Sequence, residues 1–485
     1  MKPNFNKALP LGAILLASCA TEEPIRPNIL YIFPDQYRVQ AMGFMEEDPV
    51  ITPNIDRLAS EGVVCYNAVS TSPLSSPYRG MLLTGKYPYS NHVVGNCNTY
   101  ATQFGIYLRE DEECISDVLK AEGYHCGYIG KWHLDAPEGE VAKGWQTAVW
   151  DTYTPVGDKR HGFDYWCSYG CHNQHLDPYY WEGDAPASDT TYAHKWGPIF
   201  EADKAIEFIE ARGSSAERDK DKPWALFISM NPPHGPYDQV PQEYKDLYSD
   251  TPIEELMNRP NVPLGKGGDK GRNSVRDYFA CVTGIDNEVG RILEALDRSG
   301  ERDNTIVIFT ADHGEMMGSH ALMQKNVPYE ESFRVPFILS WRGRLEHRKE
   351  SLHIGVPDVM PTLLGLVGLN GSIPEAVEGE DYSSVILEES DSRPEYSLYI
   401  RPGEQLTTAH SRGLRTDRYT FVVEKSRSGE VAKYTLFDNH TDPFQMTNIA
   451  DSSPELIKEF EPKLYARLME LNDPWMEGLV KRQTK

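Results

Sequence analysis

The chain has 485 residues, 40% of them hydrophobic, which is enough to bury a large core and to form two domains. Its 73 acidic side chains outnumber the 48 basic ones and give a net charge of −25. This balance excludes nucleic acid as a partner, because a phosphate backbone requires a basic surface. An anionic substrate is compatible with it only if the pocket supplies local positive charge.

The first 25 residues have the pattern of an export signal followed by a tether. Two lysines precede an apolar run over residues 8–17, which is too short to span a membrane. The sequence Leu16-Ala17-Ser18-Cys19 resembles a lipobox, so we expect Cys19 to carry lipid as the first mature residue. The alternative is an ordinary signal peptide with an incidental cysteine. We expect a signal peptide over 1–19, a tether over 20–25, and an exported periplasmic or outer-membrane lipoprotein.

Seven further cysteines follow, and their odd number leaves at least one unpaired or bonded elsewhere. Cys167 and Cys171 have a spacing that suits a metal or a disulfide, but no second cysteine pair accompanies them. We therefore expect buried free thiols. The seven are Cys65, Cys97, Cys114, Cys126, Cys167, Cys171 and Cys281.

Apolar runs that end in polar residues predict buried strands, and they alternate with helical patterns. This alternation predicts an α/β sheet with its ligand site at the carboxyl ends of the strands. The expected helices cover 52–59, with Thr52 as N-cap and Pro53 at the first position, and 278–296. The expected strands cover 26–33, 224–230, 305–310 and 335–341, and the first three precede Asp35, His234 and Asp312.

A helix is also expected within the stretch 75–85, where Pro77 suits the first helical position and Ser76 the N-cap. Ser75 would then lie at the positive end of the helix, with Arg79 one turn away. Such a place suits a nucleophile that attacks a charged ester. An ordinary capped helix after a turn explains the stretch equally well.

The last third of the chain changes character. A helix begins near residue 358, and a polar stretch over 388–394 suggests a domain boundary. We expect a catalytic domain over 26–390 and a smaller α+β domain over 391–485. The smaller domain would contain strands over 396–401, 414–418, 419–424 and 434–438, and a helix from residue 454.

The stretch from Ser75 to Gly85 resembles the sulfatase signature, Cys/Ser-x-Pro-x-Arg with a Leu-Thr-Gly ending. The resemblance implies a serine-type enzyme in which a radical maturase oxidises Ser75 to formylglycine, the catalytic aldehyde. It also implies an alkaline-phosphatase-like fold with a large mixed sheet flanked by helices. The smaller domain would then carry an antiparallel sheet.

Four further segments resemble the family pattern in the same order along the chain. Asp35-Gln36 and Asp312-His313 match its two pairs of metal ligands, which together with Ser75 would hold one divalent ion. Oxygen ligands favour calcium, whereas the imidazole of His313 suits softer ions better. The Asp-Gln and Asp-His variants occur among sulfatases and phosphonate hydrolases of this superfamily.

The other matches imply roles for four basic residues. Lys131 and His133, in Gly130-Lys131-Trp132-His133-Leu134, match the Lys and His beside the aldehyde hydrate. His234 matches the acid that protonates the leaving group. Lys325 matches the lysine that holds the sulfate, although a solvated surface lysine explains it as well.

Sulfated carbohydrate is the expected substrate class, since an exported lipoprotein suits foraging on external glycans. The segment Arg160 to Trp166 resembles the family segment that leads to the substrate cleft. His172, His175 and Tyr179 follow it, and such rings with polar tips suit a sugar. A surface loop rich in aromatic residues explains them equally well, and Asn96 and Asn98 are weaker candidates for the same wall.

Two rival functions stay open. In the first, unmodified Ser75 attacks a phosphate or phosphonate ester, which the variant metal pairs and Tyr78, at a position that is usually Ser or Ala, both favour. In the second, the chain is a glycan-binding lipoprotein on an inactive sulfatase fold. The presence of every expected catalytic residue argues against this second alternative.

Overall fold

A computed structural model describes residues 26–212, 218–403, 410–426 and 428–477. The predicted signal peptide and tether, with Cys19, lie outside the described residues. Within the described ranges, no helix is long and apolar enough to cross a membrane. The seven described cysteines are all buried and free, as the sequence predicts.

A ten-stranded mixed sheet forms the centre of the larger part, in the order β10-β2-β9-β8-β1-β7-β3-β4-β5-β6. Its middle five strands, from β8 to β4, pair in parallel, and β9 joins β8 in the antiparallel sense. The strands are β1 Asn28–Ile32, β2 Val63–Cys65, β3 His125–Lys131, β4 Tyr165–Tyr169, β5 Tyr179–Glu182, β6 Thr191–Tyr192, β7 Trp224–Ser229, β8 Thr305–Thr310, β9 Phe337–Ser340 and β10 Arg348–Glu350.

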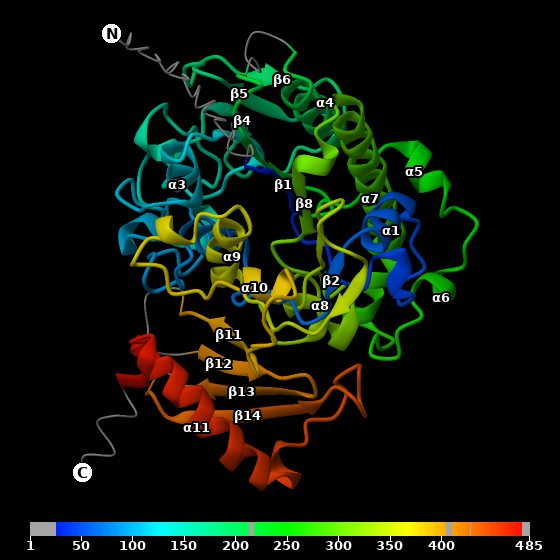
Figure 1. Ribbon diagram of the computed structural model, residues 1–485. Coiled ribbons are helices and arrows are strands. Elements are labelled where there is room, and N and C mark those ends of the chain that lie inside the picture. The colour runs from blue at the N-terminus through cyan, green and yellow to red at the C-terminus, as the bar shows by residue number, and fades with distance from the viewer. Residues whose placement is uncertain (1–25, 213–217, 404–409, 427, 478–485) are drawn as a thin grey trace, which may run out of the picture.

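Helices cover both faces of this sheet (Figure 1). One group packs around α7, with α1, α4, α5 and α6, and the other contains α2, α3, α9 and α10. The helices are α1 Pro53–Ser60, α2 Ser75–Thr84, α3 Ile115–Ala121, α4 Gly197–Ile209, α5 Gln242–Asp246, α6 Ile253–Leu256, α7 Lys266–Ser299, α8 Glu330–Phe333, α9 Val359–Leu366 and α10 Ser383–Ile386. Because the middle strands are covered on both faces, they consist of continuous apolar residues, and every residue of β1, β7 and β8 is buried.

A second, antiparallel sheet has the order β11-β12-β13-β14 and lies below the large sheet in Figure 1. Helix α11 packs against it through buried Phe460 and Leu464. The ion pair between Arg415 and Glu330, at 2.8 Å, joins it to the larger part. The elements are β11 Ser397–Arg401, β12 His410–Arg415, β13 Tyr419–Lys425, β14 Val431–Asp438 and α11 Pro454–Glu470. The predicted fold class is therefore confirmed, while the domain bounds stay predictions.

Two predicted elements of the fold differ most from the structure. Helix α7 has 34 residues and begins at Lys266, well before the predicted start at 278. Glycines obscure its first turns, yet they are needed there, since a Cβ on Gly271 would lie 2.3 Å from the carbonyl oxygen of Met317. The strand predicted over 414–418 ends at Arg415, because the amide of Thr416 donates to the carbonyl of Tyr419 at 2.8 Å and closes a turn.

Candidate active site

Ser75 is the first residue of α2 and is buried at the carboxyl edge of the large sheet. The helix begins two residues earlier than predicted, so Leu74, not Ser76, is the N-cap and Pro77 is the third helical residue. The side chain of Ser76 serves the tertiary structure instead. It donates to the carbonyl of His133 at 2.7 Å and accepts from the amide of Cys97 at 3.1 Å.

The hydroxyl of Ser75 lies between two of the predicted metal ligands. Its Oγ is 3.2 Å from Oδ2 of Asp35 and 3.1 Å from Nε2 of His313. Asp35 follows β1 and His313 follows β8, two neighbouring parallel strands, so the fold itself places them at one edge. Nδ1 of His313 donates to the carbonyl of Gly314 at 3.0 Å, which leaves Nε2 with a free electron pair toward Ser75.

Two buried cations, Lys131 and Arg79, contact the carboxylates of this cluster. Lys131, the last residue of β3, places Nζ 2.6 Å from Oδ2 of Asp35. Arg79, one turn into α2, lies 3.4 Å from Asp35 and 3.6 Å from Asp312. Its other nitrogen donates to the carbonyl of Lys131 at 2.7 Å and to Oγ of Ser229 at 2.5 Å, which fixes the guanidinium in place.

The predicted sulfate-binding lysine, Lys325, also reaches this cluster. Its Nζ donates to Oε1 of Gln36 at 2.5 Å. Nε2 of Gln36 in turn donates to Glu315 and to the hydroxyl of Tyr237, so the amide has a fixed orientation. The structure therefore brings Ser75 together with Arg79, Lys131, Lys325 and the predicted metal-binding residues that follow β1 and β8, although their roles stay predictions.

Burial and nearby charges shift the pKa values of Asp35 and Asp312 in opposite directions. Burial alone would raise the pKa of Asp35, but the nearby Lys131 and other basic groups hold it well below its ordinary value. Burial and the negative charge of Asp35 raise the pKa of Asp312 to about 7. A divalent cation between them would favour ionisation of both.

The donor set fits such a cation. Ligand atoms of Asp35, Asp312 and His313 all lie within 4.8 Å of one another. Within the described part of the chain, Oδ1 of Asp35 and Oδ2 of Asp312 are buried without a hydrogen-bond partner. Since unsatisfied buried carboxylate oxygens are costly, the two atoms are well suited to a hard cation.

Two histidines, His133 and His234, lie beside this cluster, and they donate a hydrogen bond through different ring nitrogens. Nε2 of His133 donates to the carbonyl of Cys97 at 3.3 Å, and its buried Nδ1 has no hydrogen-bond partner among the described residues. Burial and the charges of Lys131 and Arg79 lower its pKa, so the ring is a neutral acceptor. His234 instead donates through Nδ1 to the carbonyl of Gly235 at 2.8 Å, which leaves Nε2 as the atom that exchanges a proton.

The three predicted substrate residues, His172, His175 and Tyr179, lie near Asn231, which also contacts Lys131. His175 is only 1% exposed, and its Nε2 lies 3.3 Å from Nδ2 of Asn231. His172 stacks on Tyr169 and donates to the carbonyl of Tyr179 at 3.0 Å, while the hydroxyl of Tyr179 donates to Asp151 at 2.5 Å. The polar side-chain atoms of His172 and Tyr179 are thus engaged with the protein, whereas Nδ1 of His175 is buried without a hydrogen-bond partner among the described residues. The role of all three in substrate binding stays a prediction.

Sequence reasoning missed two residues that organise the site. Asn231 follows β7 and places Oδ1 3.2 Å from Nζ of Lys131. Glu315 accepts from the backbone amides of Met317 and Gln324 at 2.8 and 2.7 Å, and from Gln36. Asn231 follows β7 and Glu315 follows β8, and the ends of both strands were predicted from the sequence. Their positions just after these strands could have identified them as candidates.

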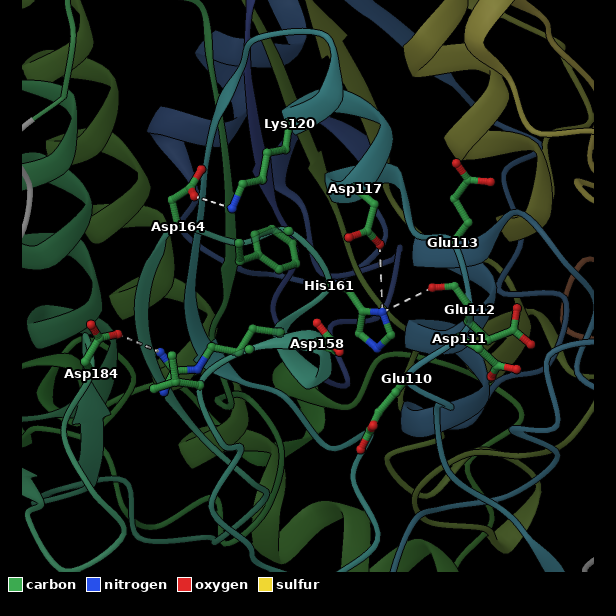
Figure 2. Close-up of a pocket in the computed structure, with 15 residues that line it drawn as sticks. Glu110, Asp111, Glu112, Glu113, Asp117, Lys120, Asp158, His161, Asp164 and Asp184 are labelled. Atoms are coloured by element: carbon green, nitrogen blue, oxygen red, sulfur yellow. Dashed lines mark hydrogen bonds and ion pairs between the residues drawn. The ribbon is translucent and has the colours of Figure 1, made fainter.

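A separate cavity of about 670 Å³ lies beside α3 and is lined mainly by carboxylates. Figure 2 shows His161 in its centre, with its ring facing Asp117 and Glu112. Ligand atoms of Cys114, Asp117 and His161 lie within 4.8 Å, but Asp117 accepts from the amide of Cys114 at 3.0 Å and so caps α3. Because its acidic lining repels anions, this cavity is unsuited to a sulfate ester.

A buried hydroxyl at a helix N-terminus, among cations and beside an acidic cation site, suits the hydrolysis of an anionic ester. The family model described as Sulfatase matches residues 27–369 of this chain. A second family model, described as N-sulphoglucosamine sulphohydrolase, C-terminal, matches residues 318–473. The chain belongs to the sulfatase family and is a sulfuric ester hydrolase.

Similar proteins extend over nearly the whole chain. The endo-4-O-sulfatase of Bacteroides thetaiotaomicron is 41% identical, over 94% of each chain. The ulvan-active sulfatase of Formosa agariphila is 35% identical, over 93% of this chain and 83% of its own. The crystal structure of yidJ from Bacteroides fragilis has a TM-score of 0.89 at 42% identity, over 95% of this chain and 99% of that one. The predicted alkaline-phosphatase-like sulfatase fold is thereby confirmed.

Proposed function

We propose that this sulfatase hydrolyses sulfate esters of sulfated carbohydrates, with a formylglycine made from Ser75 as its nucleophile. The proposed enzyme also requires one divalent cation, for which calcium is the first choice. The position of Ser75 carries the proposal. Its Oγ lies at the positive end of α2, 3.2 Å from Asp35 and 3.1 Å from His313, in a cluster with two buried cations and the half-buried Lys325. One relative is an ulvan-active sulfatase and another is an N-acetylglucosamine-6-O-sulfatase, which supports a carbohydrate substrate.

The bound cation, held by Asp35, Gln36, Asp312 and His313, would supply positive charge next to the nucleophile and the sulfate oxygens. The residues of the chain account for the remaining steps. One hydroxyl of the hydrated aldehyde loses its proton to water, which the positive charge of Arg79 favours, and its oxygen attacks sulfur in line with the leaving alcohol. Arg79, Lys131 and Lys325 hold the negative oxygens, and their fixed contacts mean that little reorganisation is needed during the reaction.

Proton transfer falls to the two histidines. His234 protonates the departing sugar oxygen through Nε2. Burial and the charges of Lys325 and Lys131 lower its pKa, and the negative charge of a bound sulfate ester opposes the two lysines and raises it again. His133, neutral and with a free Nδ1, accepts the proton of the second hydroxyl as sulfate leaves and the aldehyde forms again.

The alternative function, in which unmodified Ser75 attacks a phosphate or phosphonate ester, was favoured partly by Tyr78. This residue is 1% exposed, its hydroxyl lies 3.0 Å from that of Tyr31, and its ring packs on Phe33. Tyr78 therefore fills the core beneath α2, and its size has a packing reason that does not involve the reaction.

The test is the mass of the peptide that contains Ser75, from protein made together with its maturase. Loss of two hydrogens at Ser75, with release of sulfate from a glycan, supports the proposal. An unmodified serine with phosphatase turnover overturns it in favour of the ester rival, and the absence of both activities favours the glycan-binding alternative.

We also propose export as a lipoprotein through Cys19, in the periplasm or at the outer membrane. The sequence of the lipobox-like segment supports this. Cys19→Ser is expected to move the protein from the membrane fraction to the soluble fraction of the native host. An unchanged distribution would contradict a lipid anchor at Cys19.

A further inference from the structure

The backbone of Gln36 is held in place by the fold. Its φ of 66° lies in the left-handed region, which a residue with a Cβ adopts only at a cost. Its N–H donates to Oδ1 of Asp312 at 2.9 Å, and its carbonyl accepts from the hydroxyl of Tyr278 at 2.9 Å. The backbone therefore carries the side-chain amide to the predicted cation site, but it does not decide which end of that amide faces the cation.

The two ends of a glutamine amide differ in chemistry but hardly in shape. The oxygen accepts hydrogen bonds and can bind a hard cation, whereas the nitrogen only donates. Packing alone therefore does not select one orientation, and the polar neighbours of the amide must do so. With its nitrogen toward the cation, Gln36 would be no ligand at all.

Glu315 and Tyr237 favour one orientation of this amide. Nε2 of Gln36 donates to Oε2 of Glu315 and to the hydroxyl of Tyr237, the latter at 3.1 Å. That hydroxyl in turn donates to Oε2 of Glu315 at 2.8 Å. At the other end of the amide, Oε1 of Gln36 accepts from Nζ of Lys325 at 2.5 Å. A flipped amide would place oxygen against the carboxylate and nitrogen against the lysine, and both contacts would be repulsive.

Glu315 is itself fixed by the loop that carries Lys325. Its side chain is fully buried, and its Oε1 accepts from the amides of Met317 and Gln324 at 2.8 and 2.7 Å. Gln324 directly precedes Lys325. One carboxylate thus holds the loop through one oxygen and the predicted cation ligand through the other.

We propose that Glu315 is the positioning residue that directs the oxygen of Gln36 toward the divalent cation and Lys325. This inference rests on the proposed function, since it concerns the cation of that reaction, and it gives Glu315 a role in cation affinity. Residues that orient a metal ligand without touching the metal typically change metal affinity by about 10- to 100-fold. We expect the contribution of Glu315 to lie in this range.

Glu315→Gln tests the orientation and preserves the loop. Its oxygen can still accept from the amides of Met317 and Gln324, whereas its nitrogen would face Nε2 of Gln36, donor against donor. The amide of Gln36 should then flip, and cation affinity should fall by about 10- to 100-fold. Calorimetry measures this affinity without turnover. The chelated parent is titrated with calcium, manganese and zinc, and its preferred ion is used for the variants.

Gln36→Met separates orientation from a structural or purely electrostatic effect. Methionine has a similar length and lacks the amide, so in this background Glu315→Gln has no ligand left to misorient. The loss caused by Glu315→Gln should therefore shrink to less than about threefold, as expected for independent effects. Equal losses in the two backgrounds, unchanged affinity in Glu315→Gln alone, or failure of that variant to fold by circular dichroism would each overturn the inference.

Two further variants check this result. Tyr237→Phe removes the other partner of Nε2 and leaves the loop contacts intact, so it should weaken cation binding by about two- to tenfold, and only while Gln36 is present. Glu331→Gln is the matched control. Glu331 is a buried carboxylate that contacts Arg259 and Asn261 instead, at 3.0 and 2.6 Å, so this variant should bind the cation as the parent does. A loss in Glu331→Gln as large as in Glu315→Gln would contradict a specific role of Glu315.

Sulfate release by the matured enzyme separates this inference from the proposed function. Release of sulfate together with equal losses in the two backgrounds would refute the role of Glu315 alone. The expected dependence of Glu315→Gln on Gln36, without release of sulfate from any ester, would refute the proposed reaction alone. A parent protein that binds none of the three ions would refute both.

Discussion

Glu201→Gln is expected to change how the stability of this protein depends on pH. Glu201 lies in α4 and is only 1% exposed. Its Oε1 accepts from the hydroxyl of Tyr180 at 3.0 Å, and its Oε2 has no hydrogen-bond partner among the described residues. Burial raises the pKa of Glu201 from 4.5 to about 8, against the smaller opposing effects of Tyr180 and Arg79.

The sign and size of the effect follow from these values. The folded state holds the proton of Glu201 more tightly than the unfolded chain, so the group's contribution to stability is fully present below pH 4.5. This contribution is lost as the pH rises to about 8. The pKa values of the unfolded and folded states differ by about 3.5, which corresponds to roughly 5 kcal/mol at ~1.36 kcal/mol for each pKa unit. Glutamine keeps an acceptor for Tyr180 and does not ionise, so the variant should avoid this loss.

The assay is urea-induced unfolding at pH values from 5 to 8, followed by circular dichroism. The free energy of unfolding of Glu201→Gln should exceed that of the parent by several kcal/mol at pH 8, on the order of the value above, and by much less at pH 5. Glu207→Gln is the control, because Glu207 lies in the same helix with its side chain 42% exposed. If the parent and Glu201→Gln lost stability in parallel as the pH rose, Glu201 would already be ionised in the folded protein.

Three further results are expected at the active site. Ser75→Ala should abolish sulfate release without changing the circular dichroism spectrum, and activity near the parent level would exclude Ser75 as the nucleophile. Chelation should inactivate the enzyme and calcium should restore it best, whereas recovery with only zinc or manganese would show that His313 sets a softer site. His234→Ala should slow sugar sulfates by roughly a hundredfold to ten-thousandfold and nitrophenyl sulfate far less, since a good leaving group needs no proton. Equal losses on both substrates would mean that the proton comes from another group.

The central sheet and the place of the site were accessible from the sequence because both depend on local patterns. Runs of buried apolar residues identify β1, β7 and β8, and parallel pairing then fixes all their carboxyl ends at one edge. Asp35 and Asp312 follow two of these strands directly, so their proximity is a consequence of topology. The roles of individual residues came from the family motifs, which carry chemical information that hydrophobic patterning lacks.

The supporting contacts were not accessible, because they join residues far apart in the chain. Glu315 fixes the amide of Gln36 across 279 positions, and no periodic signal distinguishes it from an ordinary acidic loop residue. The start of α2 was predicted wrongly for a similar reason. Ser76 is a good N-cap by local chemistry, but the carbonyl of His133, 57 residues away, accepts its hydroxyl proton.

The chain has a net negative charge, whereas its site gathers three cations around the nucleophile, and distance explains how both are tolerated. Surface charges act on an approaching sulfate through salt water, where their effect decays over about 8–10 Å. The buried cations act at contact distance, as in the 2.6 Å pair between Lys131 and Asp35, where little screening water intervenes. Three cations, Arg79, Lys131 and Lys325, face the carboxylates Asp35, Asp312 and Glu315, and a divalent ion would add the excess of positive charge that an anionic ester requires. The acidic balance of the whole chain thus describes its surface, and the preference for an anionic ester is set by a few side chains at contact distance.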